Sequence, residues 1–418
     1  MDKKYQIDTT ENKAWMQELR DRLLAFGHRF PSKEGGAYYL GDDGTPWTDR
    51  PRETWITCRM LHVYSIGELL KHPDSRALQE AAFRGLSGEL KDTVHGGWYA
   101  GVRTDGTALP DKQCYAHAFV MLSLTSAVLT GLPGAEELLQ QALELYDRYF
   151  WDEEAGLAKD TWNTEFTELS PYRGINANMH TVEAFLAAAD VLGEETYRER
   201  AGRIISQVMT WAEKNAWRIP EHFHADWTPD LQYNKEKPDD PFKPFGATPG
   251  HGIEWARLIC QWAAATFGEE KKACVPYYAA AEKLYLRAVE DGWNADGAKG
   301  LVYTTDWNGA PVVHDRMHWT LAEAVNTAAV LYRVTGADRY AADYAMFMEY
   351  LDEAVLDSAT GSWFHQLDQN NRLLHTVWPG KSDLYHAVQA TLIPYNTRIG
   401  LSVAPAVKEV SAGVRSGS

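Results

Sequence analysis

The sequence predicts an all-α fold: an (α/α)6 barrel of six inner and six outer helices, with short β-hairpins in the connecting loops. Apolar residues recur at helical spacing in twelve stretches that follow one another in pairs. Within each pair the first stretch is apolar nearly all round and the second carries charge on one face. This is expected of a buried helix followed by a half-exposed one. Stretches containing glycine and aspartate follow the second helices and predict the hairpins.

The predicted helices are bounded by residues that favour helix ends. In the clearest case a Thr-Pro-Gly turn at 248–250 precedes the helix and Gly268 follows it, as suits a helix start and stop. The inner ranges are 53–71, 113–131, 177–192, 250–267, 318–335 and 382–399. The outer ranges are 75–92, 135–150, 195–217, 272–291, 337–355 and the N-terminal 11–28, which would pair with the last inner helix.

Five glycine-containing segments predict hairpins, at 35–46, 96–109, 150–163, 296–312 and 361–378. A solenoid of stacked helix pairs is the competing architecture. It is disfavoured because the sequence has no short consensus period and because such hairpins are unlike most solenoids. We expect one catalytic domain over residues 1–418, with a flexible tail over 406–418.

The composition excludes several classes of function. The chain of 418 residues carries 41 lysines and arginines against 58 aspartates and glutamates, a formal net charge of −17. It is therefore a poor candidate for binding nucleic acid or an anionic membrane. We find no window of about 18 apolar residues and no apolar signal region near the N-terminus. The four cysteines form no CxxC pair, which predicts a reduced, cytoplasmic protein without a structural zinc.

Ionisable side chains recur in the first turns of the predicted inner helices. From His117 onward they follow one another by roughly one helix pair, which would bring them to the same end of the barrel and into one concave site. An imidazole can take and give a proton near neutral pH, and a guanidinium stabilises an oxyanion. The residues are Arg59 (second turn), His117, His180, His251, His318 and His386.

Structural and metal-binding alternatives stay open. A lone histidine on an apolar helix is usually a core residue, and His117 follows Tyr115 by two positions, so it can face away from the cavity. His251 and Glu254 have the spacing HxxE and could ligate zinc, but HExxH and a cysteine cluster are absent. Five further histidines are interpreted as core residues: His62, His222, His224, His314 and His375.

Two other functions also stay open. Glycoside hydrolysis needs paired carboxylates across a cleft, for which Asp383, Glu323 and Glu254 are candidates. A sugar-binding module is the third class, because 16 tryptophans and 21 tyrosines offer faces on which sugars stack. A sugar-binding module, however, has no need of so many ionisable side chains at one end of the barrel.

Motifs along the chain resemble one protein family. They are WITCRMLHVYS (55–65), GGWYAG (96–101), RGINANMHTVEAFL (173–186), TPGHGIEWARL (248–258), GLVYTTDW (300–307) and DLYHAVQA (383–390). From about residue 50 to 400 the chain resembles the N-acylglucosamine 2-epimerase superfamily. Within it, the branch of aldose–ketose isomerases that includes D-mannose isomerase and sulfoquinovose isomerase is the most similar. The resemblance implies an (α/α)6 barrel that needs no metal or other cofactor.

The resemblance also implies roles for individual residues. His251 and His386 match the two acid/base histidines, His180 would assist opening of the sugar ring, and Arg59 would hold the substrate and the enediolate oxygen. Four further residues match substrate-contacting positions: Tyr115, Asn176, Glu254 and Trp319.

The expected reaction is interconversion of D-mannose and D-fructose, with D-lyxose and D-xylulose as a further pair. Relatives that process sulfosugars carry glutamines where this chain has His365 and Ser382, which disfavours sulfoquinovose. Sulfoquinovose isomerisation, sugar 2-epimerisation and, less favoured, glycoside hydrolysis are the alternatives. The substrate would be a monosaccharide; the sequence does not determine the oligomeric state.

Overall fold

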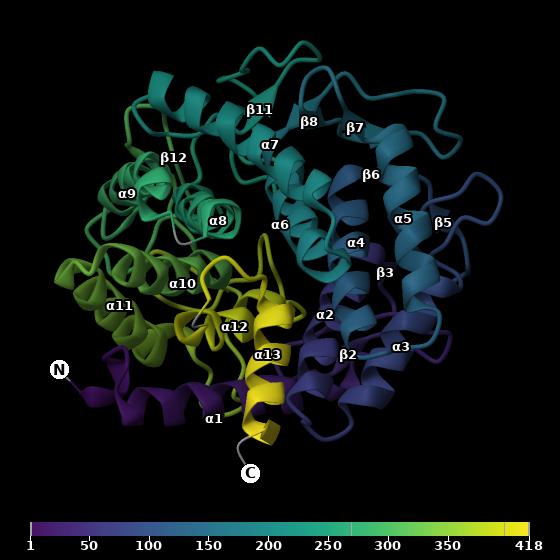
Figure 1. The fold of residues 1–418 in the computed structure, drawn as a ribbon, viewed down its shortest axis with the longest axis horizontal. Helices are drawn as coiled ribbons and strands as arrows, with labels where there is room; N and C mark the ends of the chain where they lie inside the picture. The colour runs from purple at the N-terminus through teal and green to yellow at the C-terminus, as the bar shows by residue number, and fades with distance from the viewer. Residues whose placement is uncertain (1, 269, 397, 417–418) are drawn as a thin grey trace. The chain divides into compact units, whose positions relative to one another are not determined.

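The computed structural model describes residues 2–268, 270–396 and 398–416, most of them in helices (Figure 1). The chain forms two compact units. Unit 1 comprises Met1–Leu23, Ile205–Lys381 and His386–Gly400, and unit 2 comprises Leu24–Ile204, Ser382–Tyr385 and Leu401–Ser418. The expectation of one catalytic domain stays a prediction.

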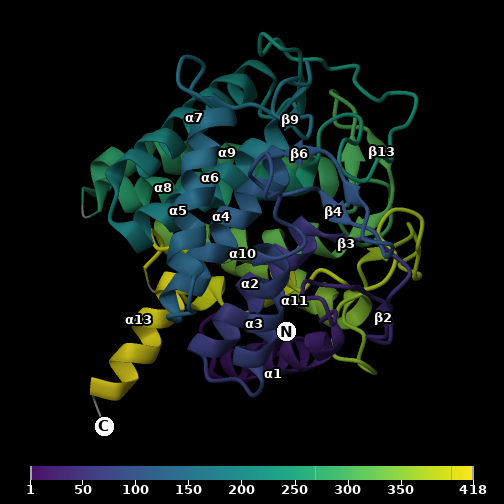
Figure 2. The ribbon, with the colours of Figure 1, turned by 90° about the vertical axis from the view of Figure 1, so that its right-hand side faces the viewer.

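Unit 2 contains three helices that are buried along most of their length, each on a predicted inner range. They are α2 (Thr54–Leu69), α4 (Cys114–Leu129) and α6 (Ile175–Leu192). Helix α4 packs against both of the others, and the amphipathic helices α3 (Ser75–Ser87) and α5 (Ala135–Tyr149) pack against α2 and α4 respectively (Figure 2). Since α3 and α5 bury one apolar side only, the predicted alternation of buried and half-exposed helices is confirmed here.

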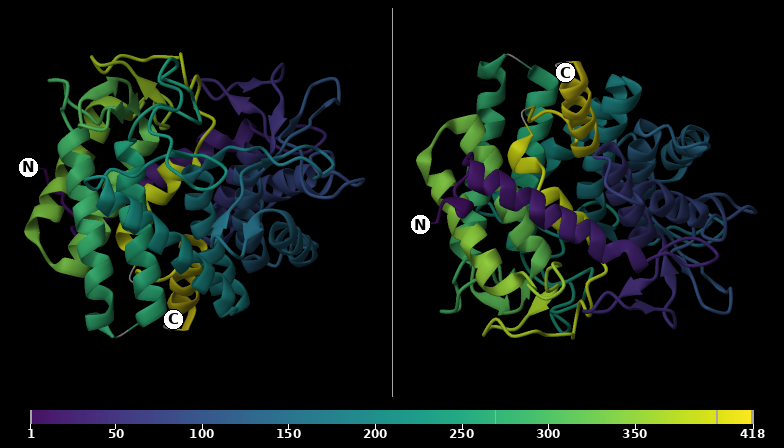
Figure 3. Two further views of the ribbon diagram at one scale, coloured as in Figure 1. Left: turned by 90° about the horizontal axis from the view of Figure 1, so that it is seen from above. Right: turned by 90° about the horizontal axis from the view of Figure 1, so that it is seen from below.

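Unit 1 repeats this pattern. The buried helices α8 (Pro249–Phe267) and α10 (His318–Thr335) pack against each other. Their partners are α9 (Lys271–Gly292), which lies beside α8 in Figure 3, and α11 (Asp338–Tyr350), which continues into a π-helical turn, Leu351–Val355. Three helices each contain a point at which the chain passes between the units: α1 (Thr10–Phe26), α7 (Glu195–Lys214) and α12 (Tyr385–Ala390).

The prediction of the last inner helix, 382–399, is wrong, because the helix in the structure is much shorter. Helix α12 covers only Tyr385–Ala390 and is followed by a 3-10 turn, Ile393–Tyr395. Asp383 lies two residues before the helix, and its Oδ1 accepts the backbone N–H of Tyr385, the first helical residue, at 3.0 Å. Pro394 offers no N–H and disfavours helical geometry in the residue before it. Residue 397, inside the predicted range, lies outside the described residues.

The C-terminal segment contains a helix that the sequence analysis did not predict, α13 (Val403–Ser416). Its buried residues Ala404, Ala406 and Val407 belong to an apolar side, and the helix packs against α2, α4 and α6. Valines at 403, 407 and 410 have helical spacing, a signal that was present in the sequence. Residues 417 and 418 of the predicted tail lie outside the described residues.

Short antiparallel hairpins follow the outer helices, as predicted. The predicted hairpins at 35–46, 96–109, 150–163 and 296–312 are confirmed. Their strands are β1 (Tyr39–Leu40) with β2 (Pro46–Trp47), β4 (Gly101–Val102) with β5 (Ala108–Leu109), β7 (Trp151–Asp152) with β8 (Leu157–Ala158), and β12 (Thr304–Thr305) with β13 (Pro311–Val313). In the fifth segment, 361–378, a single bridge joins Leu367 and Leu373.

Further strands lead directly into buried helices. Strand β3 (Arg52–Glu53) precedes α2 and pairs with β4, β6 (Lys112–Gln113) precedes α4 and pairs with β9 (Thr161–Trp162), and β14 (Arg316–Met317) precedes α10 and pairs with β15 (Gln366–Leu367). The first helical residue in each case donates its N–H to a carbonyl beside the pairing strand, as from His318 to His365 at 3.0 Å. These bonds satisfy N–H groups that a helix leaves unpaired, so the hairpins hold the N-terminal ends of the buried helices. The remaining strands are β10 (Arg173–Gly174) and β11 (His222–Phe223).

No helix among the described residues is long and apolar enough to cross a membrane.

Candidate active site

His251 lies in the first turn of α8 and is oriented by a buried carboxylate. Thr248 is the N-cap residue and Pro249 occupies the first turn, so the helix starts where the sequence predicts. The Nδ1–H of His251 donates to Glu221 Oε2 at 3.0 Å, and both side chains are buried. Because a carboxylate accepts Nδ1–H, Nε2 becomes the nitrogen that can exchange a proton with a substrate.

His386 on α12 has the same type of partner. Its Nδ1–H donates to Glu323 Oε1 at 3.0 Å, and Glu323 Oε2 accepts from Arg257 Nε at 2.8 Å. Burial by itself would raise the pKa of Glu323, but the Arg257 charge and the hydrogen bond with His386 outweigh it, so the pKa lies below its ordinary value. Glu323 is therefore a fixed anion behind the imidazole.

The two imidazoles flank one indole. The ring centroid of Trp319 lies 5.0 Å from that of His251 and 5.8 Å from that of His386. Gly250 permits this packing, because a Cβ at that position would lie 2.7 Å from the Trp319 ring. The structure thus brings together three of the predicted site residues in unit 1.

Glu254, three residues after His251, faces Arg257 with an Oε1–NH2 distance of 3.5 Å. Ligand atoms of Glu254, Glu323 and His386 all lie within 4.8 Å of one another, the spacing of a metal-binding group. The Arg257 guanidinium, however, already lies against both carboxylates and would repel a divalent cation. The cluster is better described as an ion-pair network behind His386 than as a metal centre.

Arg59, in unit 2, is held in an aromatic box. Its NH1 donates to Asp383 Oδ2 at 2.6 Å and its NH2 donates to the Tyr115 hydroxyl at 2.9 Å. The guanidinium lies 4.9 Å from the ring centroid of Trp55 and 4.6 Å from that of Phe119. A planar cation fixed in this way suits recognition of an oxyanion.

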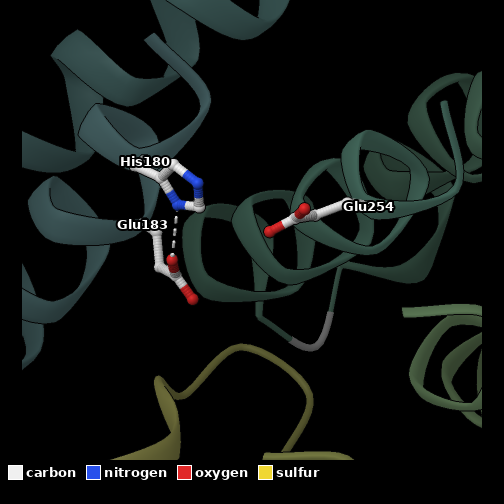
Figure 4. Close-up of side chains that lie close together, drawn as sticks. All are labelled: His180, Glu183 and Glu254. Atoms are coloured by element: carbon white, nitrogen blue, oxygen red, sulfur yellow. Dashed lines mark hydrogen bonds and ion pairs between the residues drawn. The ribbon is translucent and has the colours of Figure 1, made fainter. Parts of the chain in front are cut away.

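His180, on α6 in unit 2, also has a carboxylate at Nδ1. Its Nδ1–H donates to Glu183 Oε2 at 3.3 Å, and the same oxygen accepts a hydrogen bond from the Tyr385 hydroxyl. Figure 4 shows His180 and Glu183 side by side on α6; it also labels Glu254, whose side chain comes from α8. Asn176, one turn earlier on α6, has a buried Oδ1 with no hydrogen-bond partner in the part of the chain that the structure describes.

His117, by contrast, is a structural residue. Its Nδ1–H donates to the Gln113 carbonyl at 2.7 Å, and its Nε2 accepts the backbone N–H of Trp98 at 3.1 Å. Burial lowers the pKa of His117 to about 3, so it stays neutral. His62, with a pKa lowered by burial to about 4, bonds to Ser126 and is the core residue that the sequence predicted.

The sequence analysis missed several side chains that contact the candidate histidines. Glu183 is three residues after His180, as Glu254 is after His251, so its helical spacing was a usable signal. Glu221 lies in an irregular segment, with nothing in the sequence to connect it to His251. The rings of His318 and His365 stack with centroids 3.9 Å apart, a pairing across 47 residues of sequence that no local pattern indicates.

The candidate carboxylates for glycoside hydrolysis are all in ion pairs. Asp383 binds Arg59, whereas Glu323 and Glu254 face Arg257. A general acid for glycoside cleavage must be protonated near neutral pH, and a guanidinium neighbour favours the ionised form. This arrangement disfavours the hydrolase alternative.

Comparison with known proteins identifies the family. The family model described as N-acylglucosamine 2-epimerase (GlcNAc 2-epimerase) matches residues 35–390. D-mannose isomerase from Thermobifida fusca is 40% identical over 386 residues, covering 92% of this chain and 94% of that protein. A crystal structure of D-mannose isomerase superposes with a TM-score of 0.82 at 25% identity, over 92% of this chain and 98% of that chain. The structure of cellobiose 2-epimerase from Spirochaeta thermophila DSM 6192 superposes with a TM-score of 0.78 at 21% identity, over 94% of this chain and 99% of that chain. These matches confirm both the predicted fold class and the predicted resemblance: the chain belongs to the N-acylglucosamine 2-epimerase family.

Proposed function

We propose that this chain is an aldose–ketose isomerase that interconverts D-mannose and D-fructose without a metal or other cofactor. The 40% identity with a D-mannose isomerase over nearly the whole of both chains supports the substrate. The observation that carries the chemistry is the pair of imidazoles beside Trp319, each with Nδ1 bound to a buried carboxylate. Such imidazoles present Nε2 for reversible proton transfer.

The proposed reaction begins with the open-chain sugar. His386 Nε2 removes the proton from C2, a C1–C2 double bond forms, and the carbonyl electron pair moves to O1 to give a cis-enediolate. Arg59 stabilises the negative oxygen. His251 carries the hydroxyl proton from O2 to O1, and the His386 imidazolium returns its proton to C1. The products are the ketose and an enzyme in its starting protonation state.

We propose four further substrate contacts, at Tyr115, Asn176, Glu254 and Trp319. D-Lyxose, which has the configuration of D-mannose at C2 to C4 and lacks C6, is the second proposed substrate, giving D-xylulose. The imidazole of His365 and the hydroxyl of Ser382 replace the glutamines of sulfosugar-processing relatives, so we expect D-mannose to be preferred over sulfoquinovose.

Proton NMR of D-mannose in deuterated buffer tests the proposal, because isomerisation, 2-epimerisation and inertness leave different signals at C1 and C2. We expect fructose, with deuterium at C1 wherever the His386 imidazolium exchanges its proton with solvent before returning it. We also expect no phenol from aryl mannosides and full activity after treatment with EDTA. His386→Ala should keep its fold and lose about 10²–10⁴-fold in rate, the usual contribution of one acid/base group. Turnover like that of the wild type in this variant would contradict the mechanism.

A further inference from the structure

The surroundings of His180 fix the plane of its ring. The ring centroid of Tyr115 lies 5.2 Å away, nearly perpendicular at 82°, and that of Phe119 lies 4.5 Å away. Within this aromatic packing the Nδ1 edge of the imidazole meets Glu183, and both side chains are buried. In the tautomer that donates Nδ1–H to Glu183, the basic nitrogen of the ring is Nε2.

Glu183 is itself held by a second donor. The Tyr385 hydroxyl donates to Glu183 Oε2, the oxygen that also accepts from His180. Tyr385 is fully buried, and its ring lies 5.5 Å from Phe119 and 5.4 Å from His62. The carboxylate therefore cannot rotate away from the imidazole without losing the tyrosine hydrogen bond.

In unit 2, Glu183 is the carboxylate that is hydrogen-bonded to His180, so it can stabilise a protonated imidazole. His62 is neutral, because burial lowers its pKa to about 4. The guanidinium of Arg59 lies over the Tyr385 ring at 4.9 Å but has its own carboxylate, Asp383, at 2.6 Å. Burying a carboxylate lowers the free energy of unfolding, and an apolar side chain at position 183 would avoid this loss of stability.

We infer that Glu183 and Tyr385 are positioning residues for His180: they fix its tautomer and stabilise the imidazolium that forms when it opens the sugar ring. This inference rests on the proposed function, in which His180 acts before the isomerisation. In ring opening His180 Nε2 takes the proton of the anomeric hydroxyl, the C1–O1 bond becomes the carbonyl, and the C1–O5 bond breaks. Its electron pair goes to O5, which is protonated by water, and the proton on His180 returns to water.

Interconversion of the α and β anomers of D-mannose measures ring opening separately from isomerisation. His386→Ala serves as the background, because it removes the proposed base for C2 and replaces no residue of unit 2. In that background we expect the enzyme to accelerate anomer interconversion, measured by polarimetry or NMR. Adding Glu183→Gln should lower the acceleration by about 10-fold or more. Adding Tyr385→Phe, which keeps the ring and its packing, should lower it by a smaller factor.

Glu194→Gln is the matched control, since Glu194 is exposed in the turn after α6. It should leave both the rate of anomer interconversion and the thermal midpoint unchanged. If Glu183→Gln does not fold, the rate of anomer interconversion with Tyr385→Phe in the same background is the test of the inference. Equal interconversion rates in the background and in both added variants would overturn the inference, as would a background that does not accelerate interconversion. Absence of fructose with the wild type would instead refute the proposed function, and the anomer assay would still test the positioning of His180.

Discussion

Replacing Arg257 with methionine removes a positive charge that faces both Glu323 and Glu254. Both carboxylates are almost completely buried, as is Arg257 itself. Removing one partner of a buried ion pair typically costs about 3–5 kcal/mol, because the other charge is left uncompensated. We therefore expect Arg257→Met to lose about that much unfolding free energy near pH 7.5.

The pH dependence of this loss provides a sharper test. In the wild type the pKa of Glu323 is lowered below 4.5, so its contribution to stability is present above that pH and is lost as the pH falls through the folded-state pKa. Without Arg257, burial raises the pKa of Glu323 above its ordinary value. The variant should then gain stability relative to the wild type as the pH is lowered from 7.5 to 5.5.

Thermal unfolding, followed by circular dichroism at both pH values, measures the difference. Arg257→Met/Glu323→Gln should recover part of the loss, because the double variant no longer buries that carboxylate; the thermodynamic cycle then isolates the coupling energy. Arg76→Met is the matched control: Arg76 forms an exposed pair with Glu80, which should contribute less than about 1 kcal/mol. An Arg257→Met protein as stable as the wild type at pH 7.5, or a loss independent of pH, would refute the argument.

Three further predictions concern other residues. Glu221→Gln should lower kcat by up to about 10⁴-fold, the effect of replacing a carboxylate that orients a catalytic histidine by its amide, whereas the thermal midpoint should change little; an unchanged kcat would contradict the role of His251. Gly250→Ala places a methyl group against Trp319, so we expect a loss of about 1–3 kcal/mol and a raised KM for mannose, measured by steady-state kinetics. His117→Leu leaves the Trp98 N–H without its acceptor and should cost about 1–3 kcal/mol with unchanged kcat. Because its pKa is about 3 when folded, His117 also makes the wild type lose stability as the pH falls below about 6.5, and this part of the pH dependence should be absent from the variant.

The alternation of buried and half-exposed helices could be predicted because it depends on local patterns. The residues of α4 and α8 are apolar nearly all round and lie between turn-forming residues, so their type and position follow from helical spacing alone. The error at α12 arose because its apolar pattern continues past Ala390, while Pro394 ends the helix. Helix α13 was missed, although its valines have helical spacing.

The sequence by itself determined which histidines begin buried helices, and the family resemblance added their roles. Only the tertiary structure decided what each imidazole contacts. His117 and His180 occupy similar positions along their helices, yet the first meets two backbone groups and the second a carboxylate. Glu221 and Glu323 reach their histidines across 30 and 63 residues of sequence. Such pairs depend on how separate segments of the chain pack together. The local periodicity of a sequence shows that a side chain is buried, but not which distant residue it contacts.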